Sequence, residues 1–554
     1  MAAALRRRVT LVAAAVLSVV LVAAGCSGAS PSAGSANSTL VIYDGRSGQF
    51  TVNFNPFSPV PLNAAWGMIY QPLMFVNLAR AGDVQPLLAT KYQWSPDGKT
   101  LTFTLRSGVQ WSDGTPLTAD DVVYVFDVLE KNPKINTYSV PYAGATKIDA
   151  THVAVNFTEP AFNFSWYVLG KTFIVPKHIW TKIADPATTT NPNPVGSGPF
   201  VLSHFSAQSF DLARNPHYWD PGKPKVATVR YVSFTGNQPA LNALLGGQVD
   251  WEGGFIADID KTYVAKNPSA NKYINVPQFL TVLVPNFDAG PTRDLAVREA
   301  IYYGMDRDQI NKLAFSGYDT PSTAGLVLLP RDAKWLAPDI AAQPPSYDQT
   351  KAENFLKQAG YTKGSDGIYV SPQGVKLTIG VKVVAGYSDW IEALQVIKQQ
   401  LVKIGIDIEP QVESFSAYSV DEQNGAFDMH ITNIYGGPEP SYMYNDFLNS
   451  ANTKPIGQQA IHNFARFRDP AVDQALTMIA GTNDDNVKKQ QYSIIEHEAA
   501  TQLPYIPIMQ SSSLTEFNVG KFTGWPTQNN LYALPMPFEQ PDMGIVAADV
   551  TPVG

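Results

Sequence analysis

The chain contains one cysteine, Cys26, so it cannot form an internal disulfide bond. Its fold must therefore rest on buried apolar side chains. The 554 residues are 45% hydrophobic, which is a globular composition and enough chain for two to four domains of about 100 to 200 residues each. The formal net charge of -8 argues against a nucleic-acid partner, because phosphate binding needs a basic surface.

The position of Cys26 predicts the compartment. Three arginines at 6–8 precede an apolar run over residues 9–24, and small residues lead up to the cysteine. This pattern is typical of an export signal, and the run is shorter than the about 20 residues that a membrane-spanning helix needs. It resembles the bacterial lipoprotein signal, in which the cysteine is lipidated, although Ala23 stands where leucine is common. A chance cysteine at an ordinary cleavage site is the alternative.

We therefore predict a signal peptide over residues 1–25 and lipidation of Cys26. Residues 26–39 are rich in Ser, Gly and Ala and predict a flexible tether to the outer face of the cell membrane.

Periodicity in the remaining chain indicates an α/β fold. Apolar and threonine residues alternate over residues 100–105, as in a half-buried strand. Thr118 to Asp121 has the spacing of a capping box and predicts a helix start. Apolar residues at helical intervals over 390–404 predict a helix that ends at Gly405 and leads into a strand.

Enzymatic motifs are scarce. The chain has no Gly-x-Ser-x-Gly motif, and its seven histidines lack the close pairing of a metal-binding helix. We therefore predict a protein that is not an enzyme and has no cofactor and no metal site. An exported hydrolase with two catalytic carboxylates remains an alternative, because that arrangement is visible only in three dimensions.

An ordered series of short motifs is more informative. The motifs occupy residues 54–57, 69–73, 85–89, 94–98, 103–109, 111–117, 119–122, 174–178, 194–200, 214–219 and 297–301. In order and character they resemble family 5 of the extracytoplasmic solute-binding proteins, which are the peptide-, nickel- and oligosaccharide-binding receptors of ABC importers. The resemblance covers residues 40–510.

The resemblance implies a type II periplasmic-binding-protein fold with two lobes, a hinge and an additional inserted domain. Mapped by motif order, lobe I comprises residues 40–75, 194–288 and 512–554. The additional domain comprises residues 76–193, and lobe II comprises residues 289–511. Ligand is expected between the lobes.

The resemblance also bears on the ligand. Peptide-binding relatives hold the peptide's α-ammonium with an aspartate, and glycine occupies the matching region here, at Gly436 and Gly437. Either Glu439 takes that role, or the ligand has no free ammonium, since a buried ammonium without a counter-charge is costly.

Oligosaccharide-binding relatives use aromatic faces, for which Trp66, Trp251, Trp390 and Tyr435 are candidates. Trp251 precedes a polar, glycine-containing turn, which favours it, whereas Trp390 could equally be a core residue. The predicted ligand-binding residues are Pro59, Val60, Trp66, Trp251, Gly253, Trp390, Asn433, Tyr435, Gly436, Gly437 and Glu439.

The predicted function is a lipid-anchored, extracytoplasmic, monomeric receptor that delivers a small solute to ABC transporter permease subunits. Oligopeptide is the leading ligand class and oligosaccharide the alternative. A protein that has kept the fold but lost transport is a further alternative.

Overall fold

The protein is represented by a computed structural model that describes residues 38–80 and 82–553. Across this part of the chain, none of the helices combines the length and apolar character needed to cross a membrane.

A mixed sheet organises the described residues. Its eleven strands follow the order β17-β16-β18-β12-β19-β11-β1-β10-β9-β8, with β13 beside β19. Strand β1 is parallel to β10 and β11, whereas β12 is antiparallel to β18 and β19. The strands are β1 (Thr39–Tyr43), β8 (Phe200–Phe205), β9 (Ser209–Arg214), β10 (Thr228–Val232), β11 (Trp251–Glu252), β12 (Asn271–Pro285), β13 (Thr320–Pro321), β16 (Thr378–Val384), β17 (Asp407–Glu413), β18 (Met429–Ile434) and β19 (Ile506–Asn518).

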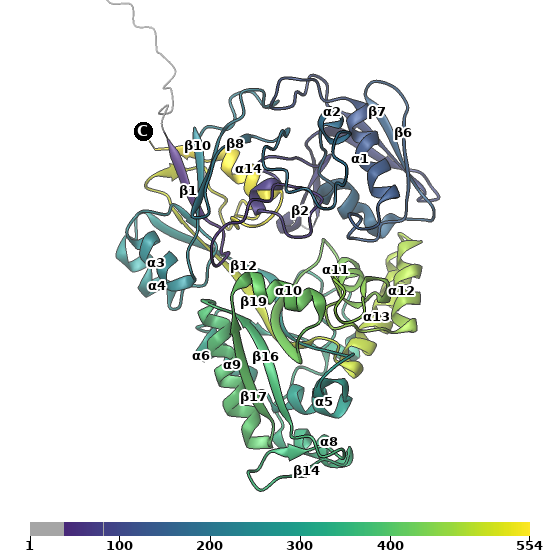
Figure 1. Cartoon of the computed structure of the whole chain (residues 1–554), viewed down its shortest axis with the longest axis vertical. Coiled ribbons are helices and arrows are strands. Elements are labelled where there is room, and N and C mark those ends of the chain that lie inside the picture. Colours follow the sequence, from purple (N-terminus) through teal and green to yellow (C-terminus); the bar gives the residue numbers. More distant parts are fainter. Residues whose placement is uncertain (1–37, 81, 554) are drawn as a thin grey trace, which may run out of the picture. The chain divides into compact units, whose positions relative to one another are not determined.

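Strands β12 and β19 connect two bodies of the structure (Figure 1). The first body contains the described residues before β12 and those after β19, and the second contains the elements between β12 and β19. The ladder between β12 and β19 is irregular, with register shifts after Pro277 and after Thr281. Such irregularities bend a strand locally, so this ladder is where one body could rotate against the other.

A second, smaller sheet lies in the first body, with strand order β4-β5-β7-β6. Helix α1 (Ala119–Lys131) packs against β6 and β7. The predicted strand over residues 100–105 is β5, and its alternate residues Leu101, Phe103 and Leu105 are buried. The predicted capping box is present, because the backbone N–H of Thr118 donates to Oδ2 of Asp121 at 2.7 Å. The strands are β4 (Ala89–Trp94), β5 (Thr100–Leu105), β6 (Tyr142–Lys147) and β7 (His152–Phe157).

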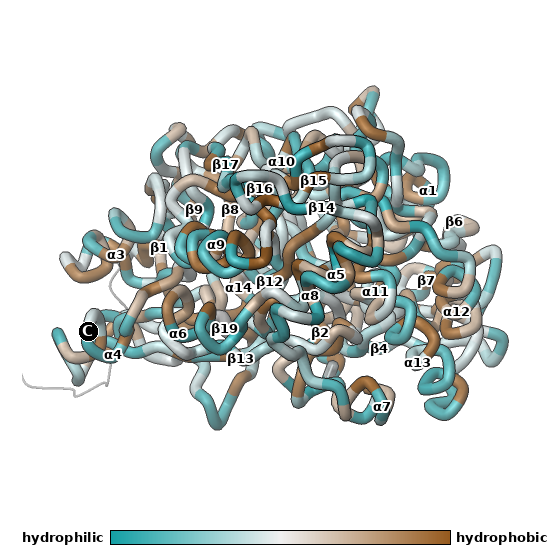
Figure 2. The backbone as a smooth tube through the Cα atoms, turned by 90° about the horizontal axis from the view of Figure 1, so that it is seen from below, coloured by the Kyte–Doolittle hydropathy of each residue, from teal (hydrophilic) through white to brown (hydrophobic). Residues whose placement is uncertain are grey.

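In the second body, α9 (Ser388–Leu401) packs against β16 and β17. Leu394, Ile397 and Leu401 are fully buried, and Figure 2 shows apolar and polar residues alternating around the helix. The chain then turns at Gly405, whose φ of 81° favours glycine, and enters β17. The predicted helix-to-strand unit over residues 390–408 is therefore confirmed.

The remaining elements complete the two bodies. The helices are α2 (Lys177–Trp180), α3 (Asn237–Leu245), α4 (Ile259–Thr262), α5 (Leu295–Gly304), α6 (Arg307–Ala314), α7 (Pro338–Ala341), α8 (Gln349–Gln358), α10 (Phe415–Asn424), α11 (Pro440–Leu448), α12 (Pro470–Ala480), α13 (Asp485–Gln502) and α14 (Asp542–Asp549). The short strands are β2 (Met74–Asn77), β3 (Asp83–Pro86), β14 (Thr362–Lys363), β15 (Tyr369–Val370), β20 (Phe522–Thr523) and β21 (Thr551–Pro552).

Candidate functional site

A cleft lies between the two bodies and consists of adjoining pockets. The central pocket has a volume of about 430 Å³ and shares residues with both of the others. The Trp66 pocket, of about 400 Å³, includes Trp66 and Tyr138 of the first body and Phe415 of the second. The Trp390 pocket is smaller, about 130 Å³, and includes Trp390 of the second body. A cleft of this size, lined by aromatic side chains and by polar groups, is typical of a small-molecule site.

The two bodies contact each other on one flank of the cleft through hydrogen bonds to backbone carbonyls and through closely packed glycines. Oγ of Ser47 donates to the carbonyl of Ala385 at 3.0 Å, and the hydroxyl of Tyr387 donates to the carbonyl of Gly45 at 3.2 Å. The backbones approach closely, since a Cβ on Gly236 would lie 2.5 Å from Cα of Gly386.

The opposite flank is closed by tyrosines. The hydroxyl of Tyr167 donates to Oδ1 of Asp446 at 2.7 Å, and the hydroxyl of Tyr442 accepts from the backbone N–H of Trp166 at 3.1 Å. The structure therefore shows the bodies in contact at both ends of the cleft, as a closed arrangement requires.

Seven of the eleven predicted ligand-binding residues line these pockets. Asn433 lines all three, and its Oδ1 accepts a hydrogen bond from Oγ1 of Thr281 at 2.7 Å. Tyr435 is 47% exposed and packs edge-on against Phe279. The seven are Pro59, Val60, Trp66, Gly253, Trp390, Asn433 and Tyr435.

The aromatic candidates among these seven are only partly buried. Trp66 stacks on Phe173 with ring centroids 5.9 Å apart, and its Nε1 donates to the carbonyl of Pro56. Trp390 packs against the core of the second body and also lines two pockets, so its role in ligand binding stays a prediction.

Trp251 is placed in the core instead of the cleft. Its side chain is fully buried, its Nε1 donates to the carbonyl of Pro535 at 2.6 Å, and its ring packs edge-on against Trp525. The polar turn expected after it begins one residue late, because Glu252 belongs to β11 and is also fully buried. Trp251 lines none of the three pockets.

Gly436, Gly437 and Glu439 also lie outside the linings of these pockets. The two glycines allow close packing, since a Cβ on Gly437 would lie 2.5 Å from the ring of Trp166. Glu439 forms an ion pair with Lys488, whose Nζ is 2.9 Å from Oε1. Its charge is therefore already balanced, which does not fit the predicted contact with a peptide ammonium.

Several ionisable cleft residues were not identified from the sequence. Burial raises the pKa of Asp389 to about 6, that of Asp446 to about 7 and that of Glu422 to about 8. The cation Lys171 lies 3.4 Å from Oε1 of Glu539 and donates to the carbonyl of Gln540 at 2.6 Å. Asp389 directly precedes the predicted Trp390, which was the one available sequence signal.

Two predictions concern other chemistry. Among the described residues, no group of three or more His, Cys, Asp and Glu side chains is arranged to hold a metal ion. The predicted lipidation site Cys26, the signal peptide and most of the tether lie outside the described residues.

Comparisons with known proteins assign this chain to a family. Residues 83–455 match the model for bacterial extracellular solute-binding proteins, family 5 Middle. The glutathione-binding protein GsiB of Escherichia coli is 26% identical over 507 residues, covering 85% of this chain and 91% of its own. The nickel-binding periplasmic protein of Escherichia coli is 24% identical over 480 residues, covering 84% and 88%.

A solved structure of a related protein has the same fold. The mannohexaose-bound periplasmic oligopeptide-binding protein of an ABC transporter from Thermotoga maritima superposes with a TM-score of 0.87 at 25% identity, covering 93% of this chain and 99% of its own. The expected type II periplasmic-binding-protein fold is thus confirmed, while the domain borders predicted from motif order stay predictions. The chain belongs to family 5 of the bacterial extracellular solute-binding proteins.

Proposed function

We propose that the protein is an extracytoplasmic receptor that captures a small solute between its two bodies and delivers it to the permease subunits of an ABC importer. The observation that carries this proposal is a cleft whose pockets are lined by residues of both bodies. The β12–β19 ladder connects these two bodies. A ligand that contacts both bodies stabilises the closed arrangement over an open one.

The proposed partner follows from the relatives. The Thermotoga maritima protein is described as part of an oligopeptide ABC transporter, and this chain covers 99% of it. A permease that recognises both bodies at once would bind the closed receptor best, because only closure fixes their relative placement. We propose that the receptor acts as a monomer.

The proposed cargo is an oligopeptide, with an oligosaccharide as the second candidate. Relatives support both, since one solved relative is named as an oligopeptide-binding protein and contains mannohexaose. The cleft supports both as well, because Trp66 and Tyr435 offer aromatic faces while Asn433 and Thr432 offer hydrogen-bonding groups.

Native mass spectrometry of the gently purified full chain, combined with small-angle scattering, tests the receptor function. We expect a retained small solute and a smaller radius of gyration with solute than after its removal. Turnover of the solute would instead support the exported hydrolase, and an unchanged radius of gyration would contradict a closing receptor.

We further propose that Cys26 anchors the receptor to the cell membrane through covalent lipid. One acyl chain binds membranes only marginally, so firm anchoring requires several chains. Cys26→Ala should release a folded protein into the soluble fraction. Continued membrane association of this variant after a salt wash would contradict the anchor.

A further inference from the structure

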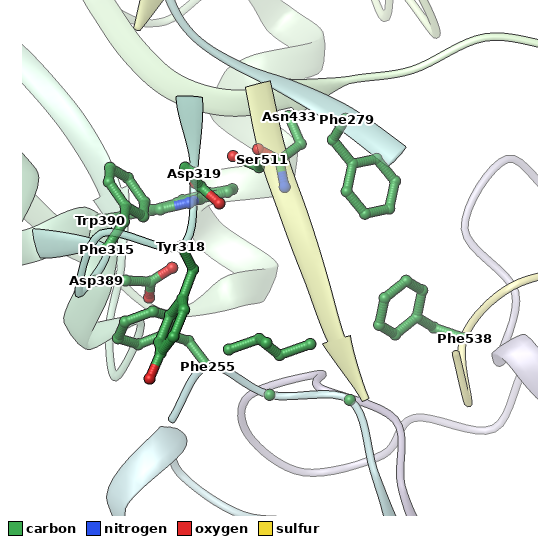
Figure 3. A pocket seen from close by; sticks show the side chains of 13 residues that line it. Phe255, Phe279, Phe315, Tyr318, Asp319, Asp389, Trp390, Asn433, Ser511 and Phe538 are labelled. Atoms are coloured by element: carbon green, nitrogen blue, oxygen red, sulfur yellow. The ribbon is translucent and has the colours of Figure 1, made fainter. Parts of the chain in front are cut away.

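The Trp390 pocket has an unusual chemistry for part of a solute site (Figure 3). Among the described residues that line it, aromatic side chains predominate and come from both bodies. Two lining residues are aspartates, and none is Lys, Arg or His. The aromatic residues are Phe255, Phe279, Phe315, Tyr318, Trp390 and Phe538.

The aromatic side chains form two groups around the pocket. Phe255 of the first body meets Phe315 of the second edge-on, with ring centroids 6.5 Å apart. Phe279 and Phe538 form a second pair at 6.2 Å, and Figure 3 shows this pair across β19 from Trp390. Aromatic faces from several directions attract a cation through their quadrupoles.

Asp389 contributes a carboxyl group without a cationic partner among the described residues. Its Oδ1 accepts a hydrogen bond from Nδ2 of Asn237 at 3.3 Å, and backbone N–H groups at the start of α9 also favour its charged form. Asp389 lies in the first turn of α9, where the helix dipole favours a negative charge. Burial nevertheless outweighs that effect, since the pKa of Asp389 is raised to about 6.

Further carboxyl groups lie behind the pocket wall. The turn after β11 presents Gly254 to the pocket, and Oε1 of Glu252 lies 3.0 Å from where a Cβ on Gly254 would be. Glu252 is opposite Glu516 across the β11–β19 ladder, and both are fully buried. Neither carboxyl group has a hydrogen-bond partner among the described residues. Burial raises the pKa of Glu252 to about 8 and also raises that of Glu516, so both carboxyl groups are largely protonated at neutral pH.

Carboxyl side chains also outnumber cationic side chains in the rest of the cleft. Its three pockets together are lined by six described carboxyl side chains and two cationic ones, Arg46 and Lys171. Both cations have partners within the protein, because Arg46 donates to the carbonyl of Pro61 and Lys171 lies beside Glu539. Carboxyl side chains therefore outnumber cationic ones in the described lining of the cleft.

We propose that the Trp390 pocket receives a cationic organic group of the ligand, either an ammonium or a guanidinium group, between its aromatic faces and Asp389. This proposal rests on the proposed solute-capture function. A volume of about 130 Å³ suits one side-chain-sized group, while the adjoining central pocket holds the rest of the solute. A neutral sugar ring would use the aromatic faces but would leave the charge of Asp389 uncompensated.

Competition between three probes tests the proposal on the full-chain protein. The probes are a tetrapeptide amide with a free amino terminus and one arginine, its N-acetylated counterpart amide with citrulline in place of arginine, and mannohexaose. Citrulline keeps the shape of arginine without the charge. We expect the wild type to retain the arginine peptide at least about tenfold better than either neutral probe, as one partly buried ion pair provides.

Asp389→Asn should reduce retention of the arginine peptide about tenfold while the two neutral probes bind as before. Asp366→Asn is the matched control, because Asp366 is exposed, forms an ion pair with Lys376 and lines none of the three pockets. Thermal unfolding of both variants should match the wild type, which separates lost binding from lost folding.

The outcomes separate this inference from the receptor function. Preferred retention of a neutral probe with compaction in scattering would overturn the cationic group and leave the receptor intact. Equal binding of the arginine peptide to wild type and Asp389→Asn would overturn it as well. If the protein retains none of the three probes, the proposed cationic group is overturned as well. The receptor function is then tested separately, by whether protein purified from its native host contains a bound solute.

Discussion

The hydroxyl of Tyr167 in the first body lies 2.7 Å from Oδ1 of Asp446 in the second body. The same hydroxyl is also 3.1 Å from the carbonyl of Tyr442. These buried contacts cross the cleft at the edge of the Trp66 pocket, whose lining includes Asp446. Because they exist only when the bodies meet, they should stabilise the closed arrangement specifically.

Tyr167→Phe should therefore weaken ligand binding without unfolding either body. A hydrogen bond contributes about 1 kcal/mol, or up to about 3 kcal/mol where its partner is charged, so we expect about a tenfold loss of affinity. Calorimetry with the retained solute measures it. Tyr532→Phe is the control, because its hydroxyl bonds to Gly524 within the first body. An equal loss in both variants would exclude a specific role of Tyr167 in closure.

The other flank of the cleft gives a steric test. A Cβ on Gly236 would lie 2.5 Å from Cα of Gly386, so Gly236→Ala should keep the bodies apart. With solute present, we expect the variant to have a larger radius of gyration than the wild type and to bind the solute about tenfold more weakly. Gly222→Ala is the control, since Gly222 also has a positive φ but would place its Cβ in open space. Normal compaction of Gly236→Ala would show that this contact does not limit closure.

Local features of the fold could be predicted because they depend on neighbouring residues. The alternation over residues 100–105 and the helical spacing before Gly405 each reflect one buried face. Burial of Trp251 depends instead on distant segments, since β11 pairs with both β1 and β19. A two-residue strand has too little periodicity to indicate which side it buries.

The cleft residues could also be predicted only where the signal lies in neighbouring residues. Asn433 and Tyr435 line the pockets and lie in a segment that a family pattern indicated, whereas Glu439, the only carboxylate in residues 432–440, is balanced by Lys488 from α13. That pairing spans 49 positions and has no local signal. Asp389 faces the cleft only because α9 begins beside Asn237 of the other body.

The ion pair between Glu439 and Lys488 should matter for stability and not for binding. Both side chains are largely buried, so Glu439→Gln leaves the lysine without a counter-charge. We expect a loss of about 3 to 5 kcal/mol in the free energy of unfolding, measured in denaturant, with unchanged solute affinity. Adding Lys488→Met should recover part of the loss. A large loss of affinity at unchanged stability would instead make Glu439 a ligand contact.

Glu422, at the junction of the Trp66 and central pockets, should make stability depend on pH. Burial raises the pKa of its carboxyl group to about 8, above the ordinary value of 4.5 that applies to the unfolded chain. The folded state therefore favours the protonated form. The resulting stabilisation is fully present below about pH 4.5 and is lost as the pH rises through about 8.

The groups around Glu422 do not reverse this sign. The hydroxyl of Tyr418 donates to Oε1 at 3.4 Å, and His430 lies 3.5 Å away. Burial lowers the pKa of His430 to about 3, so the imidazole is neutral over this pH range and offers no compensating charge. Lys382 is already engaged by Glu413 and Asp421.

Glu422→Gln removes the titration while keeping the shape of the side chain. Thermal unfolding at pH 5 and pH 8 should show a wild-type midpoint that falls with rising pH, and a fall that is smaller by a few degrees in the variant. Asp446 and Glu496, whose pKa values burial also raises, should preserve part of the wild-type slope. Glu409→Gln, at an exposed position of β17, is the control and should retain the full slope. If Glu422→Gln has the wild-type slope, the carboxyl group is ionised in the folded protein at neutral pH and must be stabilised by a bound cation or by hydrogen bonds from water.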